Sequence, residues 1–413
     1  RDARTPVEIV AFDLTAPVST KPRLRLRLTS QHNQPVSGRL RVALGGLAVE
    51  AGESTGAPGE AVTVPLTFAP RERQWIELPV RGEPRPDNTY PLNVTFDAGP
   101  LGIAPHTEAL HVNWISRKTL QVDGQLDDWA GALPQVVRTD AAREESFEEK
   151  MYLPFEKVAP GKAGGLAVGY AAADDRFFYF AAKIADDSPH PGTCRFASRD
   201  EDADFYPEVS FSRRDGRTVE YRWPGGVPRF SYRRWPSIPS SMPQAAFDNV
   251  LLAFNVLPEA EKGWLTHLPG RFPGFIWRRT TDHEYALNRV ADAFGGGTEI
   301  WRLFAPGMPY KHFYPRQPKH PLEGAVTEGR LVVRYDSGWR IVECAIPWSE
   351  IPTVKARRDA GQTVKFNFRV NSDTPAPDLV LSLDRSACEG ISPSFHPNWI
   401  QQSPNELEFG FEP

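Results

Sequence analysis

The chain has 413 residues and a formal net charge of −4, from 48 Lys and Arg against 52 Asp and Glu. Its charges are interspersed, so nothing favours a nucleic-acid partner, and no run approaches the ~18 consecutive apolar residues of a membrane span. The 40 Pro and 32 Gly, together with very few helix-periodic segments, predict an all-β protein with many loops. The length suffices for two or three domains.

A first β-sandwich is predicted for residues 1–115. The segments Arg23–Leu28 and Arg39–Leu44 alternate arginine with apolar residues, as a half-buried strand requires. Turn-rich pieces separate the strands at spacings typical of an Ig-like sandwich. We interpret the arginine-rich face as the solvated surface of a spacer domain, with an anion-reading patch as the alternative. Further strands are expected at 61–68, 74–80, 90–96 and 108–114.

The stretch LQVDGQLDDWAGAL (120–133) divides the chain. Asp123-Gly124 is a strong turn signal, because Gly accepts positive φ and the Asp carboxylate can hold nearby backbone N–H groups. Trp129 is large enough to plug one end of a β-core. The boundary is therefore placed at 113–118, and a second domain is predicted for residues 116–413.

The second domain has readable framework strands. Asp336-Ser-Gly338 predicts a hairpin turn, and Pro347–Ile351 predicts one helical turn. Residues ~213–326 interrupt this framework, and a segment of that length should fold over the sheet as a cap or subdomain. The framework strands are expected at 165–170, 176–184, 205–212, 330–335, 339–346 and 365–371.

Four pieces of the second domain carry a family resemblance. They are VDGQLDDW (122–129), DDRFFYFAAKIADDSP (174–189), GWRIVECAIPWSEI (338–351) and FNFRVNSD (366–373). In this order they resemble family 9 carbohydrate-binding modules and their DOMON-like relatives. The resemblance implies two β-sandwich domains, the second an antiparallel family-9-like sandwich with a large insertion. It also implies an exported, non-catalytic protein, or the binding part of a larger secreted one, that binds a polysaccharide or oligosaccharide.

The same resemblance implies sugar-contacting residues. Family 9 modules hold a sugar between two tryptophans, and Trp399, which follows Asn398, corresponds to the C-terminal one. The other falls near 199–205, where this chain has RDEDADF and no Trp. A second platform would then come from Phe205, Tyr206 or the insertion. There, aromatic residues alternate with arginines, which suits an acidic or neutral glycan or a cap that packs its own rings. The insertion candidates are Tyr221, Trp223, Trp235 and Arg234.

An acidic run offers a candidate metal site. Asp200, Asp202 and Asp204 could bind Ca²⁺, which takes several carboxylate and carbonyl oxygens on a flexible loop. A solvated acidic loop is the alternative. The resemblance supports structural calcium, which these modules often carry, and no organic cofactor is expected.

Two other functions stay open. Asp282, His283 and Glu284 could perform acid/base catalysis on a polysaccharide, or could form a salt-bridged loop network. Met308 with His312, or Met242, could be axial ligands to haem b in an electron-transfer domain. The polar residues that would join the catalytic or salt-bridged cluster are Tyr285, Glu299, Arg302, Lys311, His312 and Arg316.

The three cysteines are too few for a disulfide scaffold and lack zinc-ligand spacing. Cys344 lies in an apolar run and is predicted to be a buried thiol. Cys194 and Cys388 lie in loop-like sequence and could pair in an exported protein. The chain opens at Arg1 without a signal peptide, and an extracytoplasmic location is expected.

Overall fold

The structure is a computed structural model. Within the strands 203–206, 209–214, 217–222, 227–230, 264–265, 277–278 and 380–382 it describes the backbone only. The described residues are 5–52, 54–137, 167–186, 189, 191–192, 203–206, 209–214, 217–222, 227–230, 248–258, 264–265, 277–278, 282–292, 295–306, 324–371, 380–382 and 408–413.

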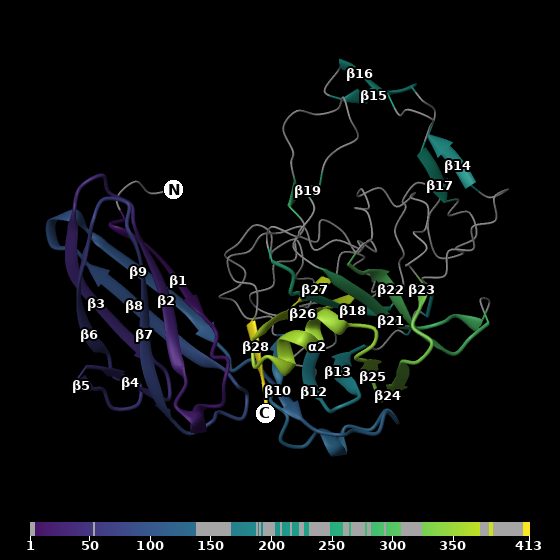
Figure 1. The fold of residues 1–413 in the computed structure, drawn as a ribbon, viewed down its shortest axis with the longest axis horizontal. Helices are drawn as coiled ribbons and strands as arrows, with labels where there is room; N and C mark the ends of the chain where they lie inside the picture. Colours follow the sequence, from purple (N-terminus) through teal and green to yellow (C-terminus); the bar gives the residue numbers. More distant parts are fainter. Residues whose placement is uncertain are drawn as a thin grey trace.

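The first part of the chain forms one nine-stranded sheet, in the order β1-β2-β7-β4-β3-β8-β9, with β5 on β4 and β6 on β3. All of its strand pairs are antiparallel. Figure 1 shows it as the purple and blue layers. The strands are β1 Val7–Phe12, β2 Arg23–Ser30, β3 Val36–Leu44, β4 Leu47–Ala51, β5 Ser54–Thr55, β6 Val62–Phe68, β7 Arg73–Gly82, β8 Tyr90–Asp97 and β9 Ile103–Leu110, with 3-10 turns at Val18–Thr20 and Gly99–Leu101.

The leucines of β2 explain why the strands of this sheet pack face to face around one core. Leu24, Leu26 and Leu28 are fully buried, and they belong to one core with Leu40 of β3 and Phe96 of β8. The arginines between these leucines point outward, as the period-two pattern predicts. The first domain is therefore a β-sandwich. In place of the expected strand at 108–114, β9 begins at Ile103 and ends at Leu110. It begins earlier because Pro105 does not prevent its pairing with β8, where it stands opposite Thr95.

The second part of the chain forms a thirteen-stranded sheet, in the order β23-β22-β21-β18-β26-β28-β10-β12-β13-β25-β24, with β11 on β12 and β27 on β26. Its strands are β10 Trp114–Arg117, β11 Gln135–Val137, β12 Ala167–Ala173, β13 Phe177–Ala185, β18 Asn249–Asn255, β21 His283–Arg289, β22 Thr298–Phe304, β23 Gly324–Ala325, β24 Arg330–Asp336, β25 Trp339–Pro347, β26 Val364–Asn371, β27 Val380–Ser382 and β28 Glu408–Phe411.

This sheet folds over between β28 and β10, which pair in parallel, so that its two halves face each other. Phenylalanines from both halves form the core. The ring of Phe178 in β13 lies 5.1 Å from that of Phe254 in β18, and Phe180 lies 5.0 Å from Phe368 in β26. Gly169 of β12 faces Phe368, where an added Cβ would lie 2.5 Å from the ring. The result is a second β-sandwich, and the all-β fold with two sandwiches is confirmed.

Part of the expected insertion belongs to the sheet itself. Strands β18, β21 and β22 all come from residues 213–326. In the second sandwich β18 pairs with β26, β21 pairs with β18, and β22 pairs with β21. The segment therefore supplies framework strands as well as intervening chain. Three two-stranded sheets form from β14 Ala203–Tyr206 with β17 Val227–Phe230, β15 Val209–Arg214 with β16 Arg217–Arg222, and β19 Trp264–Leu265 with β20 Trp277–Arg278.

The turn at Asp123-Gly124 has the structure that its sequence predicts. Gly124 has φ +81°, and the Asp123 carboxylate accepts a hydrogen bond from the Gln125 N–H at 2.8 Å. Trp129 lies in a 3-10 turn, Asp127–Trp129, and is buried in one cluster with Ala172 of β12 and Ala345 of β25. These two residues alternate with core residues along their strands, so Trp129 covers the outer face of the sheet, and the predicted plug at one end of the core is wrong. Glu343 of β25 binds this whole motif. Its carboxylate accepts the Asp123 and Gly124 N–H groups at 2.9 and 2.7 Å and the Trp129 indole N–H at 2.8 Å.

Two other local predictions have different outcomes. Ser337 and Gly338 both have positive φ and connect β24 to β25, so the hairpin is confirmed. The expected turn starts at Pro347, the last residue of β25, whose carbonyl accepts the Glu350 N–H at 2.9 Å, but it is a single turn and not part of a helix. Helix α2, Pro352–Asp359, begins at the next proline instead. Cys344 is fully buried in the second core, as predicted, and burial raises the pKa of its thiol.

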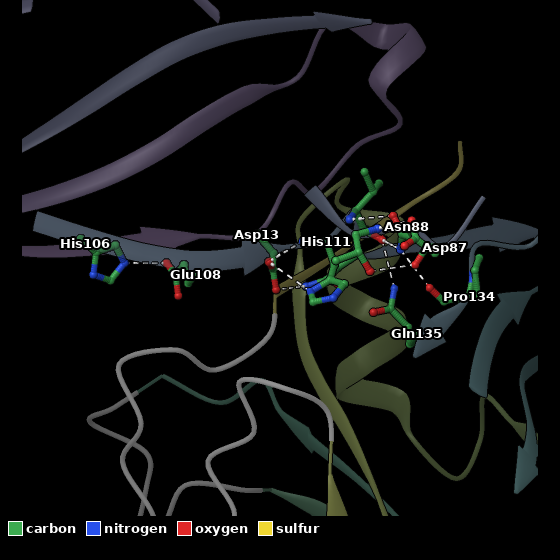
Figure 2. Close-up of polar contacts among 11 residues, drawn as sticks. Asp13, Asp87, Asn88, His106, Glu108, His111, Pro134 and Gln135 are labelled. Atoms are coloured by element: carbon green, nitrogen blue, oxygen red, sulfur yellow. Dashed lines mark hydrogen bonds and ion pairs between the residues drawn. The ribbon is translucent and has the colours of Figure 1, made fainter. Parts of the chain in front are cut away.

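Polar side chains form hydrogen bonds between the segments that meet at the junction of the two sandwiches (Figure 2). Asn88 is buried and donates to the carbonyls of Val112 and Pro134 at 2.9 and 3.0 Å. Asp13 accepts the backbone N–H of His111 at 2.9 Å and the Asn113 side-chain amide at 3.0 Å. These contacts fix the segment that leads from β9 into β10.

Candidate functional site

Most of the residues that the sequence singles out lie outside the described residues. Tyr221 belongs to β16 and Asp204 to β14, where the backbone alone is described. The candidates thus remain predictions. Those outside the described residues are Trp399, Asn398, Trp223, Trp235, Arg234, Asp200, Asp202, Met242, Met308, Lys311, His312, Arg316, Cys194 and Cys388.

The described residues bring together a different set of polar side chains, on the outer face of strands β22, β21, β18 and β26. The inner face of these strands carries core residues such as Val250, Leu252 and Phe254. Because strand residues alternate, their neighbours point to the opposite side. There, amides and carboxylates replace apolar groups, and all of them are buried. This polar face consists of Asn249, Asn255, Glu284, Asn288, Glu299, Trp301 and Asn367.

The strand register sets the order of groups on the polar face. Glu284 of β21 stands opposite Ala253 of β18, which in turn stands opposite Asn367 of β26. Asn288 stands opposite Glu299 of β22, and its amide donates to the Glu299 carboxylate at 3.1 Å. The small Ala253 thus lies between the polar groups of Glu284 and Asn367.

An indole borders the same face. Trp301 of β22 stands opposite Ala286 of β21 and is 7 % exposed. Ala286 pairs in turn with Leu251 of β18. One row across the sheet therefore presents an indole, a methyl group and a leucine, with carboxylates in the neighbouring rows. Chemically, such a face combines hydroxyl-binding groups with an apolar surface.

The cluster that starts at Asp282 does not form one site. Asp282 accepts the backbone N–H groups of Val256 and Leu257 at 2.5 and 2.6 Å, so its carboxylate holds a turn. His283 and Tyr285 lie on the inner side of β21, with stacked rings 6.4 Å apart, whereas Glu284 lies on the outer side. Sequence neighbours are separated here because alternation sends them to opposite faces of the strand.

The inner-side residues form a network with the segment before α2. His283 hydrogen-bonds Thr353 at 2.6 Å, and the Tyr285 hydroxyl donates to the Glu350 carbonyl at 3.2 Å. Arg302 forms an ion pair with Glu350. Burial, and then the Glu350 carboxylate, raise the pKa of Tyr285 well above its ordinary value. A salt-bridged network was one of the two predictions for this cluster, beside acid/base catalysis. In the structure Arg302 pairs with Glu350 rather than with the acids near Asp282.

A second buried charge cluster lies on the inner side of the sandwich, opposite the core residue Ile184, and was missed by sequence reasoning. Arg340 of β25 is 1 % exposed and lies 3.3 Å from Asp186 and 3.5 Å from Asp248. The Tyr335 hydroxyl donates to Asp248 at 3.0 Å. Burial lowers the pKa of Arg340, but the neighbouring Asp248, Tyr335 and Asp186 outweigh this effect. The net pKa is raised above its ordinary value, so the guanidinium stays charged. Asp248 directly precedes Asn249, and the cluster therefore fixes the start of β18.

Across the described residues, no group of three or more His, Cys, Asp and Glu side chains could hold a metal ion. Among the same residues, no helix has the length and apolar character needed to cross a membrane.

No family model and no curated protein matches the chain. Two similar solved structures are family 9 carbohydrate-binding modules from Caldicellulosiruptor kristjanssonii. One, in complex with cellotriose, is 13% identical, covers 73% of this chain and 93% of its own, and has a TM-score of 0.34. The other, in complex with glucose, is 14% identical, covers 72% and 94%, and has a TM-score of 0.33.

Proposed function

We propose that the protein binds a polysaccharide or oligosaccharide without cleaving it, and that it does so outside the cytoplasm. The observation that carries this proposal is the polar face. A sheet face with a purely structural role would gain most from apolar side chains, because each buried polar group must be compensated by a hydrogen bond. Seven buried amide, carboxylate and indole groups on four adjacent strands suit a ligand rich in hydroxyls.

The resemblance of four sequence segments to family 9 modules supports the same class of ligand. It adds Trp399 as a stacking platform beside Asn398, with Tyr221, Trp223, Trp235 and Arg234 as further contacts. It also adds structural calcium at Asp200, Asp202 and Asp204. The two matched structures contain cellotriose and glucose, and β-glucans are therefore the first ligands to test.

Retention in affinity electrophoresis with soluble β-glucan, xylan and mannan tests the proposal. We expect Glu284→Gln and Trp399→Ala each to weaken retention on the preferred glycan at least about tenfold, which is about 1.4 kcal/mol. Glu328→Gln is the matched control, because Glu328 is an exposed carboxylate in a turn of the same sandwich. Melting midpoints of all variants verify that they are folded.

Each variant tests a separate part of the proposal. Loss with Glu284→Gln alone assigns the ligand to the polar face, and loss with Trp399→Ala alone assigns it to the Trp399 platform. No retention on any glycan, or equal retention by wild type and both variants, overturns the proposal. Added Ca²⁺ and a chelator, compared with Asp202→Asn, test the calcium site through the melting midpoint.

A further inference from the structure

A second aromatic surface lies on the first sandwich, far along the chain from the polar face. Trp75, the third residue of β7, is 52 % exposed. Among the described residues, Ile103 is the only other large hydrophobic side chain with a comparable exposure. An indole is a large apolar group that normally buries most of its area. Its open position on a regular strand therefore needs an explanation.

Phe12 holds the indole in a fixed place. The two ring centroids lie 5.1 Å apart with an interplanar angle of 37°. Two guanidinium groups also lie over the Phe12 ring, with Arg25 at 5.5 Å and Arg27 at 5.9 Å from the ring centroid. Cross-strand register explains this grouping, because Phe12 pairs with Arg25 in β2 and Arg27 pairs with Trp75 in β7.

The arginines of this face differ in their partners. Arg25 is 2.6 Å from Glu408, and Arg23 is 4.0 Å from Glu77. Within the described part of the chain, Arg27 and Arg73 have no carboxylate at ion-pair distance. The Arg27 Nε is buried and has no hydrogen-bond acceptor there.

We propose that the Trp75 face, defined as Phe12, Arg25, Arg27, Arg73 and Trp75, binds a carboxylated polysaccharide. A uronate ring can stack its C–H side on the open indole while its carboxylate meets a guanidinium fork, which fits such a group in bidentate geometry. A neutral glycan would leave the charge of Arg27 and Arg73 unused. A nucleic acid is disfavoured, because Glu77 lies on the same face and the whole chain is acidic.

This inference does not rest on the function proposed for the second sandwich, and one experiment separates them. Polygalacturonate is the probe, and the same polymer with its carboxyl groups methyl-esterified is the uncharged control. We expect the full chain to bind polygalacturonate, to bind the ester at least tenfold more weakly, and to lose affinity as NaCl rises. Trp75→Ala and Arg73→Gln should each weaken binding about tenfold or more.

Arg41→Gln is the matched control, because Arg41 is an exposed, outward-facing arginine of β3 whose cross-strand neighbours are Thr63 and Thr95. It should leave affinity unchanged. Arg73 is exposed, so its replacement leaves the fold intact. Equal affinity of wild type and Trp75→Ala, equal affinity for the methyl ester, or equally tight binding of single-stranded DNA or dextran sulfate overturns the proposal. Glu284→Gln should not alter polygalacturonate binding, and Trp75→Ala should not alter β-glucan retention.

Discussion

Replacing Glu343 tests whether one carboxylate holds the Asp123–Trp129 motif against the second sandwich. Its side chain is fully buried and accepts three hydrogen bonds from groups more than 200 residues away in sequence. Burial raises the pKa of Glu343, and the hydrogen bonds from Trp129, Gly124 and Asp123 only partly reverse that effect. The carboxylate is thus costly to bury and is stabilised by these donors.

The size of the effect follows from the donors that Glu343→Ala would leave behind. The Gly124 N–H and the Trp129 indole N–H are both buried, and each unsatisfied buried donor costs about 1–3 kcal/mol. Removing the buried carboxylate returns part of this cost. We therefore expect a net destabilisation of about 3 kcal/mol, which lowers the melting temperature of a domain of this size by about 5 °C.

Scanning calorimetry of the second sandwich measures the change, and Glu328→Ala is the control, expected to fall within about 0.5 kcal/mol of wild type. Trp129→Phe removes the indole N–H and completes a double-mutant cycle. Its cost should be about 1 kcal/mol smaller in the Glu343→Ala background, because the shared hydrogen bond is then already absent. Additive costs, or a Glu343→Ala protein as stable as the control, would refute the assigned role.

Two further predictions concern a titrating carboxylate and a tightly packed glycine. Burial raises the pKa of Asp174, but hydrogen bonds from Arg176, Phe177 and Tyr179 outweigh it, so the folded pKa is lowered. The contribution of Asp174 is therefore present above its unfolded pKa of about 4 and is lost as pH falls through the folded value. The stability gap between wild type and Asp174→Asn, measured by urea denaturation, should shrink from pH 6 to pH 3, and a constant gap would contradict this. Gly410 packs at the junction, where an added Cβ would lie 2.1 Å from the Thr15 carbonyl oxygen. Gly410→Ala should lower stability by about 1–3 kcal/mol through overpacking, and an unchanged melting midpoint would show that the junction yields freely.

Local sequence signals predicted the elements whose geometry depends on a few neighbouring residues. The Asp123-Gly124 and Asp336–Gly338 turns formed as expected, because Gly124 and Gly338 adopt positive φ without steric cost. Strand β2 formed because alternation already separates its leucines from its arginines. In contrast, NVLLAFN of β18 is buried at every position, and its central residues show no alternation of polar and apolar side chains. A short apolar run of this kind does not distinguish a strand from a helix.

The sequence by itself determined that the chain is all-β, where its main turns lie, and which face of β2 is apolar. Only the tertiary structure decided which carboxylates share a surface. Glu284 and His283 are adjacent in sequence but lie on opposite faces, whereas Glu284 and Asn367 are separated by more than eighty residues and share one face. The physical reason is that side-chain direction along a strand is local, whereas strand pairing depends on the sum of many distant contacts in the core.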